Sequence, residues 1–219
     1  MTAGTGVDVK ICGIRTPDDY DACHAAGAAF VGMVFFPRSP RHLSMGEART
    51  LADHADCAGG GPSRVALTVD VDDAGLEDVV ATARPHLIQL HGNETPERAA
   101  AIRERFGLPL IRAIRVAGPE DLAACAAWEG IADWLLFDAK GDPGGLPGGT
   151  GHVFDWNLLA DHAGKTRWML AGGLSVDNID RAVAVTGATA VDVSSGVESA
   201  PGKKDADRIR NFVSRAQLG

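Results

Sequence analysis

The sequence Lys10-Ile11-Cys12-Gly13 lies near the start of the chain, and Val191-Asp192-Val193-Ser194-Ser195-Gly196-Val197-Glu198 lies near its end. Each is a short apolar run, rich in β-branched residues, that breaks into small residues, a pattern typical of the carboxyl edge of a buried strand. If the chain closes into a barrel of parallel strands, its first and last strands become neighbours. We therefore expect the thiol of Cys12 to lie beside the two serine hydroxyls.

Six further runs of the same kind separate these two ends. The eight expected strands cover residues 8–12, 30–35, 64–70, 87–91, 110–116, 134–138, 167–171 and 189–194. Their hydrophobicity is nearly continuous, as in parallel strands that are covered on both faces. Eight strand–helix units in 219 residues predict an α/β protein, a single-domain (β/α)8 TIM barrel over residues 1–219. A doubly wound open sheet, with fewer strands and a site in a crevice, is the alternative.

Helix signals lie between the strands. Thr16-Pro17 combines an N-cap with proline at the first helical position, and Gly27 ends that helix. Ser44 and Glu47 have the spacing of a capping box. Ser175 is the expected N-cap of the helix after the seventh strand. Residues 1–7 precede the first strand and are expected to be flexible.

The composition argues against several classes of function. A net charge of −8 opposes binding to nucleic acid or to an anionic membrane surface. No apolar run approaches the roughly 18 residues of a membrane span, and the N-terminus lacks the apolar region of a signal peptide. Reduced thiols in a cytoplasmic protein are therefore expected. The four cysteines lack metal-ligand spacing, so no metal is expected: Cys12, Cys23, Cys57 and Cys125.

The strand ends supply candidates for acid–base chemistry, because the active site of such a barrel lies at the carboxyl ends of its strands. Asp138 ends a strongly apolar strand, where burial disfavours the charged form of a carboxyl group and suits a general acid. Its alternative role is to cap the following loop. Cys12, once deprotonated, can serve as a base or nucleophile. Cysteine is more often a small core residue, so that alternative also stays open.

Two glycine-containing strand ends predict a phosphate site. Gly172-Gly173 follows the seventh strand, and Ser194-Ser195-Gly196 ends the eighth. Glycines let a ligand approach the backbone, and successive N–H groups bind anions. Barrels often hold phosphate at the loops after these two strands. The alternative is that Gly172-Gly173 only turns the chain.

Four further residues near strand ends are polar or charged. His91 can bind substrate or form a hydrogen bond within the rim. Asp192 lies between two valines and needs a polar partner if it is buried. Arg38 and Arg41 lie in the proline-rich loop 36–44, where one of them can grip a carboxylate in bidentate fashion.

Together these residues resemble the phosphoribosylanthranilate isomerase family. The motifs run in order from residue 9 to about residue 213, and their order and spacing are specific, although no single tetrapeptide is decisive. They are Lys-Ile-Cys-Gly at 10–13, Phe-Pro-Arg-Ser-Pro-Arg at 36–41, Gln-Leu-His-Gly at 89–92, Phe-Asp-Ala-Lys at 137–140, Gly-Gly-Thr-Gly at 148–151, Phe-Asp-Trp at 154–156, Ala-Gly-Gly-Leu at 171–174 and the segment 192–202.

The resemblance implies an intramolecular oxidoreductase of tryptophan biosynthesis. The reaction would be the Amadori rearrangement of N-(5′-phosphoribosyl)anthranilate to 1-(2-carboxyphenylamino)-1-deoxyribulose 5-phosphate. Asp138 matches the family's general acid, Cys12 its general base and Arg41 the arginine that holds the anthranilate carboxylate. The remaining expected substrate-binding residues are His91, Gly172, Gly173, Asp192, Ser194, Ser195 and Gly196.

The resemblance also implies that no cofactor is needed, because the substrate nitrogen serves as the electron sink. The expected partner is the small phosphoribosyl substrate, and the protein is expected to be a cytoplasmic monomer or homodimer. Two features depart from the family pattern. Strand three reads Val65-Ala66-Leu67-Thr68-Val69, and the stretch 140–151 carries extra glycine and proline. This stretch suits a mobile lid or a tolerated insertion.

Other phosphosugar barrels are the rival interpretations. A metal-dependent pentose-phosphate epimerase would need several His and Asp ligands at strand ends, where only His91 and Asp138 qualify. An indole-glycerol-phosphate synthase would want a lysine acid at a strand end, whereas Lys10 lies within the first strand. A barrel that only binds a phosphometabolite would keep the phosphate site but would not require Cys12 or Asp138.

Overall fold

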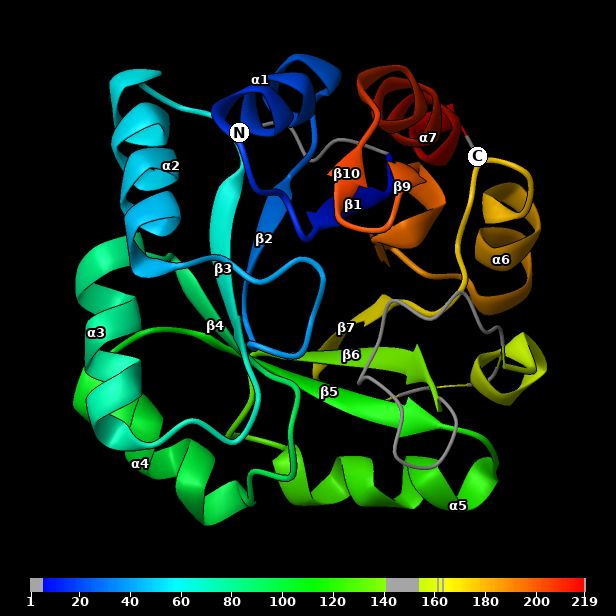
Figure 1. The fold of residues 1–219 in the computed structure, drawn as a ribbon. Coiled ribbons are helices and arrows are strands. Elements are labelled where there is room, and N and C mark those ends of the chain that lie inside the picture. The colour runs from blue at the N-terminus through cyan, green and yellow to red at the C-terminus, as the bar shows by residue number, and fades with distance from the viewer. Residues whose placement is uncertain (1–5, 141–153, 161, 163, 219) are drawn as a thin grey trace.

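Eight parallel strands close into a barrel in the computed structural model, which describes residues 6–140, 154–160, 162 and 164–218 (Figure 1). Pairing of Val9 on the first strand with Val191 on the last closes the ring. The predicted TIM barrel is thus confirmed, and the open sheet is excluded. The strands are β1 (Asp8–Cys12), β2 (Phe30–Phe35), β3 (Ser63–Thr68), β4 (Leu87–Leu90), β5 (Leu110–Val116), β6 (Trp134–Ala139), β7 (Arg167–Leu170) and β8 (Ala190–Val193).

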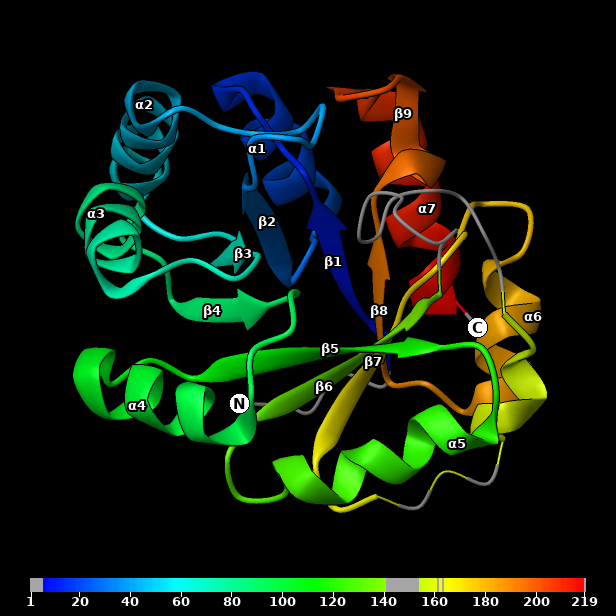
Figure 2. The same ribbon diagram turned by 60° about the horizontal axis from the view of Figure 1, so that its bottom comes forward.

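Helices form the outer layer around these strands. They are α1 (Pro17–Ala26), α2 (Met45–Cys57), α3 (Asp73–Ala83), α4 (Pro96–Phe106), α5 (Pro119–Leu122), α6 (Ile179–Thr186) and α7 (Ala206–Leu218), with the 3₁₀ helices η1 (Ala123–Trp128) and η2 (Trp156–Leu159). This outer layer is uneven. The short helix α5 is followed directly by the 3₁₀ helix η1, and among the described residues between β6 and β7 the helical segment is η2. Figure 2 shows α4 and α5 along the outside of β5.

Local capping chemistry explains where the helices begin. Thr16 accepts a hydrogen bond from the backbone of Asp19, and the Asp19 carboxylate accepts one in return, which completes a capping box. The predicted box at Ser44 also forms. The predicted cap at Ser175 is wrong, because α6 begins after Asn178. The Asn178 amide instead accepts a hydrogen bond from the Ser175 backbone at 2.8 Å and pins the loop after β7.

The core has two layers that the strands separate. On β6, Leu135 and Phe137 pack outward with the helices, whereas Trp134 and Leu136 pack inside the barrel. Successive side chains on a strand point to opposite faces, so a strand covered on both faces must be apolar at almost every position. This arrangement confirms the interpretation of the continuous apolar runs.

A small hairpin follows β8 and was not expected from the sequence. The turn η3 (Ser195–Val197) leads into β9 (Glu198–Ala200) and β10 (Lys203–Lys204), which pair in antiparallel fashion. Gly202 in the turn has φ +76°, and a Cβ there would lie 2.5 Å from the carbonyl oxygen of Pro40. The hairpin therefore packs closely against the loop 36–44, which requires a glycine at this contact.

Two expectations fall partly outside the described residues. Residues 1–5 and 141–153 lie outside them, so flexibility at the N-terminus and a lid over 140–151 stay predictions. Val7 is buried against the core. Within the described part of the chain, every helix is too short or too polar to cross a membrane.

Candidate active site at the mouth of the barrel

The thiol of Cys12 lies at the carboxyl end of β1, inside the barrel mouth. Its residue is 6% exposed and packs against Val34 of β2 and Leu67 of β3. Gly32 makes room for the thiol, because a Cβ at this position would lie 2.9 Å from the sulfur. The cysteine is therefore both a packed residue and a strand-end residue, and its neighbours decide what it can do.

A buried ion pair lies one layer below the thiol. Lys10 is fully buried, and its Nζ donates a hydrogen bond to Asp192 Oδ1 at 2.8 Å across the β1–β8 pair. Burial acts to lower the pKa of Lys10, but the charges of Asp192 and Cys12 outweigh it and hold that pKa above its ordinary value. The prediction that Asp192 needs a polar partner is confirmed, and the partner is Lys10.

The ionisation of Cys12 reflects two opposing effects. Burial raises the pKa of the thiol, because it disfavours the charged thiolate. Lys10 and Lys204 oppose this effect, and Asp192 adds to it. The two lysines are therefore the groups that favour the ionised form of the Cys12 thiol.

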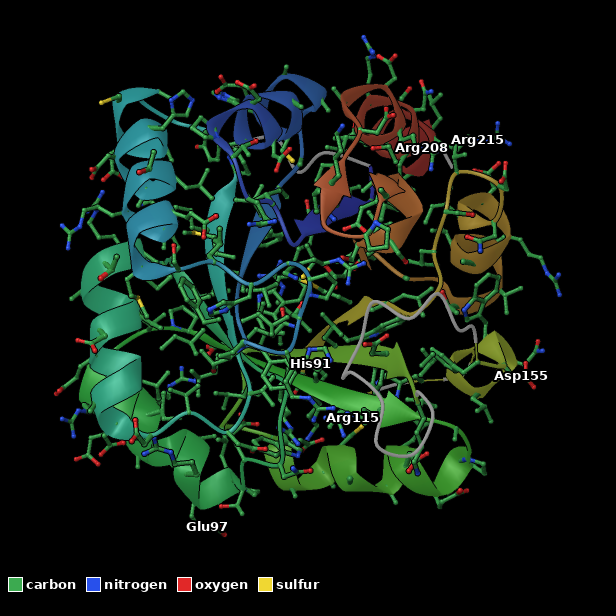
Figure 3. All side chains as sticks on the ribbon, viewed as in Figure 1. His91, Glu97, Arg115, Asp155, Arg208 and Arg215 are labelled. Atoms are coloured by element: carbon green, nitrogen blue, oxygen red, sulfur yellow. The ribbon has the colours of Figure 1, made fainter. Side chains whose placement is uncertain are left out.

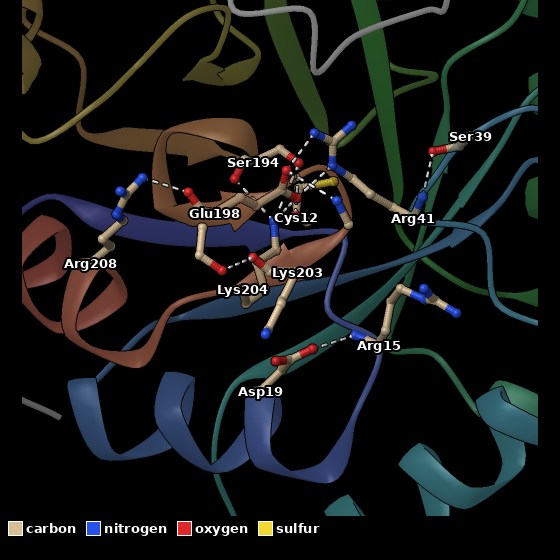
Figure 4. A network of polar contacts seen from close by, with 12 residues as sticks. Cys12, Arg15, Asp19, Ser39, Arg41, Ser194, Glu198, Lys203, Lys204 and Arg208 are labelled. Atoms are coloured by element: carbon tan, nitrogen blue, oxygen red, sulfur yellow. Dashed lines mark hydrogen bonds and ion pairs between the residues drawn. The ribbon is translucent and has the colours of Figure 1, made fainter.

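A second charged network joins the loop 36–44 to the hairpin after β8 (Figure 4). Glu198 accepts hydrogen bonds from Arg41 Nε at 2.7 Å and Arg41 Nη2 at 2.8 Å. The same carboxylate accepts a bond from Lys204 Nζ at 2.9 Å. Burial acts to raise the pKa of Glu198, but Arg41 and Lys204 outweigh it and hold that pKa below its usual range. Arg41, the predicted carboxylate-binding residue, is thus already held by a carboxylate of the chain.

The loops after β7 and β8 touch one another, as the sequence predicts. Gly196 lies so close to the carbonyl oxygen of Leu174 that any side chain there would clash. Gly172 and Gly173 have φ values of +85° and +64°, which favour glycine. Ser194 Oγ donates a hydrogen bond to the Cys12 carbonyl oxygen at 3.0 Å. The first and last strands are thus neighbours, as expected, and the hydroxyl of Ser194 contacts the backbone of Cys12.

Asp138 lies at the mouth on β6, buried among different neighbours. Its Oδ1 accepts a hydrogen bond from the Ala139 N–H at 2.9 Å, and its Oδ2 lies 3.4 Å from His91 Nε2. A Cβ on Gly172 would lie 2.6 Å from the Ala139 nitrogen and 3.2 Å from Asp138 Oδ1. The missing side chain of Gly172 therefore gives the carboxyl group its place.

His91 follows β4, and both its ring and its backbone carbonyl have polar partners. Gln89 Nε2 lies 2.8 Å from its Nδ1, and Arg115 Nη2 donates a hydrogen bond to its carbonyl oxygen at 3.0 Å. Figure 3 shows His91 and Arg115 together in the middle of the molecule, whereas Glu97 and Arg215 lie at its periphery. These contacts leave the imidazole edge at Nε2 facing Asp138.

The comparisons with known proteins identify the family of the chain. The family model for N-(5′-phosphoribosyl)anthranilate (PRA) isomerase matches residues 9–215. The chain belongs to this family. An N-(5′-phosphoribosyl)anthranilate isomerase of Parvibaculum lavamentivorans is 50% identical over 96% of this chain and 98% of its own. The chain is thus an isomerase of tryptophan biosynthesis, as the resemblance implied, and the rival barrel families are not favoured.

Solved structures of the family have the same fold. Phosphoribosyl anthranilate isomerase from Thermotoga maritima is 34% identical, with a TM-score of 0.85, over 96% of this chain and 98% of its own. A structure of a phosphoribosyl anthranilate isomerase in complex with reduced 1-(O-carboxyphenylamino)-1-deoxyribulose 5-phosphate is 33% identical, with a TM-score of 0.82, over 96% of this chain and 98% of its own.

Two charged residues at the mouth were missed by reasoning from the sequence. Glu198 and Lys204 lie on β9 and β10, three and two residues long, which are too short for an alternating pattern to be recognised. The only available signal was the turn sequence Pro201-Gly202 just before two lysines. In the part of the chain that the structure describes, no three His, Cys, Asp or Glu side chains gather in a way that would hold a metal ion.

Proposed function

We propose that the barrel mouth carries out the family's Amadori rearrangement with Asp138 as general acid and Cys12 as general base. The observation that carries this proposal is the placement of a buried carboxyl group and a buried thiol at one end of a closed barrel. The two groups lie on β6 and β1, three strands apart around the ring. One bound sugar can therefore present its ring oxygen to one group and its C2′ hydrogen to the other.

Asp138 opens the ribose ring. Its proton passes to the ring oxygen as the bond from C1′ to that oxygen breaks, and the lone pair of the substrate nitrogen forms the C1′=N bond. The carboxylate that remains accepts the Ala139 N–H and lies beside the His91 ring. Both contacts are in place before the charge develops, which is how a preorganised site stabilises it.

Cys12 then acts on the Schiff base. Its thiolate takes the C2′ proton, the electron pair of that bond forms C1′=C2′, and the nitrogen receives the electrons of the C1′=N bond. The enolamine becomes the ketone when the C2′ hydroxyl loses its proton and C1′ gains one. No electrons leave the substrate, so the reaction consumes no redox cofactor. Lys10 and Lys204 favour the thiolate that this step requires.

The other groups at the mouth fit the two anionic ends of the substrate. Arg41 uses its Nε and Nη2 edge for Glu198, and a guanidinium group has further N–H donors for the anthranilate carboxylate. The glycine-rich backbone at 172–173 and 194–196 supplies N–H groups for the phosphate. A cytoplasmic location and a monomeric or homodimeric state stay predictions.

The test is an assay in which N-(5′-phosphoribosyl)anthranilate is generated in situ and its fluorescence decay is followed. The wild-type protein should accelerate the decay. Cys12→Ser and Asp138→Asn should each lower kcat by about 10²–10⁴, the usual contribution of general acid–base catalysis. Exposed residues of the same types provide matched controls: Cys57→Ser, and Asp8→Asn at the opposite end of β1, should keep the wild-type rate.

Each failure has its own meaning. A wild-type protein without activity would contradict the reaction itself. Near-full activity in Cys12→Ser would remove the thiol from the mechanism and leave Asp138 to be explained with another base.

A further inference from the structure

The charges around Cys12 do not balance. Within the described part of the chain, the network contains three cations and two carboxylates: Lys10, Arg41, Lys204, Asp192 and Glu198. Lys10 has Asp192 for itself, and Arg41 binds Glu198 through two hydrogen bonds. Lys204 must share Glu198 with Arg41 and is the cation in surplus. Buried cations are costly without a counter-charge, so this surplus needs an explanation.

Lys204 is held in a geometry that leads to Cys12. Its side chain is 1% exposed, and its Nζ lies 3.0 Å from the Ser194 carbonyl oxygen and 3.4 Å from Ser194 Oγ. Ser194 Oγ in turn donates to the Cys12 carbonyl oxygen at 3.0 Å. Figure 4 shows these residues side by side, with Glu198 next to Lys204. The ammonium group is thus connected to the backbone of Cys12 through one serine.

The charges of Lys204 and Cys12 favour one another, as their positions suggest. Burial holds the pKa of Lys204 below its ordinary value, although Glu198 and then Cys12 act against that effect. In return, Lys204 acts to lower the pKa of the Cys12 thiol. An ionised Cys12 would be the third anion that balances the three cations.

We propose that Lys204 is a positioning residue for the Cys12 base: it fixes the Ser194–Cys12 contact and places the surplus positive charge beside the thiol. This inference rests on the proposed role of Cys12 as base. Glu198 links Lys204 to Arg41, so one carboxylate holds both the lysine and the arginine. The groups that act on the thiol charge come from several elements: Lys10 of β1, Asp192 of β8, Lys204 of β10 and Arg41 of the loop 36–44. Glu198 of β9 acts on Lys204 and Arg41.

The experiment measures the thiolate directly. The ultraviolet absorbance of the thiolate is followed against pH in wild type, Lys204→Gln and Lys204→Met. From each curve, the absorbance of the same protein carrying Cys12→Ser is subtracted. Removing the positive charge should move ionisation of Cys12 to higher pH by about one unit, and kcat/KM near neutral pH should fall about tenfold with it. Lys203→Gln is the matched control, because Lys203 is the exposed neighbour on the same strand and should change neither quantity.

The variants should fold, because Glu198 keeps its two bonds to Arg41 when Lys204 is replaced. An unchanged thiolate titration in either folded variant would overturn the proposal, whatever happens to activity. Failure of both variants to fold would also overturn it, because Lys204 would then be a structural residue. The titration needs no turnover. A shift in ionisation together with a fully active Cys12→Ser would support the effect of Lys204 on the thiol and contradict Cys12 as the base.

Discussion

The two sides of the barrel mouth differ in the groups that surround Cys12 and Asp138. On the Cys12 side, buried lysines, an arginine and carboxylates form a connected network. On the Asp138 side, the carboxyl group accepts a hydrogen bond from a backbone N–H and faces the imidazole of His91, neither of which carries a permanent charge. Cys12 and Asp138 are both buried, so burial alone does not distinguish them.

The difference fits the roles that we propose for Cys12 as base and Asp138 as acid. A base must lose its proton before it can act, and burial opposes this for Cys12, so cations are needed nearby. A general acid must arrive with its proton, and a neighbouring cation would favour its loss. The same fold therefore sets the thiol among charges that act on its ionisation, and it sets the carboxyl group against a backbone N–H and an imidazole.

The largest expected effect comes from breaking the buried ion pair between Lys10 and Asp192 on the Cys12 side. Asp192→Asn would leave the fully buried Lys10 without its carboxylate partner. Removal of one member of a buried pair typically costs about 3–5 kcal/mol, so the free energy of unfolding in urea should fall by that amount. Asp180→Asn is the control, because Asp180 pairs with Arg215 on the surface and surface pairs contribute little. Equal losses in the two variants would contradict the importance of the buried pair.

A substitution on the Asp138 side, at Gly172, should affect catalysis. In Gly172→Ala the new methyl group would lie 2.6 Å from the Ala139 nitrogen and 3.2 Å from Asp138 Oδ1, so the carboxyl group must move. A displacement of this kind should lower kcat about 100-fold in the fluorescence assay.

Gly187→Ala separates this displacement from backbone strain. Gly187 has φ +66° and open space around its Cα. The alanine there should cost stability of about 1–2 kcal/mol and leave kcat unchanged. If Gly172→Ala keeps its kcat, the close packing of Gly172 against Asp138 has no catalytic consequence.

The smallest expected effect uses Cys23, a buried thiol outside the mouth. Burial in α1 raises the pKa of Cys23 from 9.0 to about 12. A folded-state pKa above the unfolded one means that its contribution to stability is complete below pH 9 and is lost as the pH rises toward 12. At about pH 10 the loss should be about 1.4 kcal/mol relative to about pH 8, and Cys23→Ala should not show this part of the alkaline destabilisation. A pH-independent difference between the two proteins in urea unfolding would contradict the assignment.

Much of the fold could be predicted because its signals are local. The apolar runs marked all eight strands to within two residues at each end, and the side chains of Thr16 and Ser44 marked two helix starts. Ser175 misled because a serine before a helix resembles a cap, whereas the real start depends on the Asn178 side chain folding back onto the loop. That choice is made by the packing of the loop after β7 and has no local signal.

The candidate site was predictable only in part. Strand ends identified Cys12, Asp138 and the glycine pairs, because the topology of a barrel brings all carboxyl ends to one face. The role of Gly172 in making space for Asp138 could not be predicted, because its clash is with an atom 33 residues away. The same holds for Glu198, whose partner Arg41 is 157 residues away in the chain.

By itself, the sequence determined the order of the eight strands, the barrel they form and the residues that end them, because burial and capping are set by neighbours along the chain. Tertiary structure decided how the charges are shared. The pairing of Lys10 with Asp192, and of Glu198 with both Arg41 and Lys204, depends on distances between strand ends after the ring has closed. Electrostatic energies depend on those distances and on burial, and neither is written in the local pattern of residues.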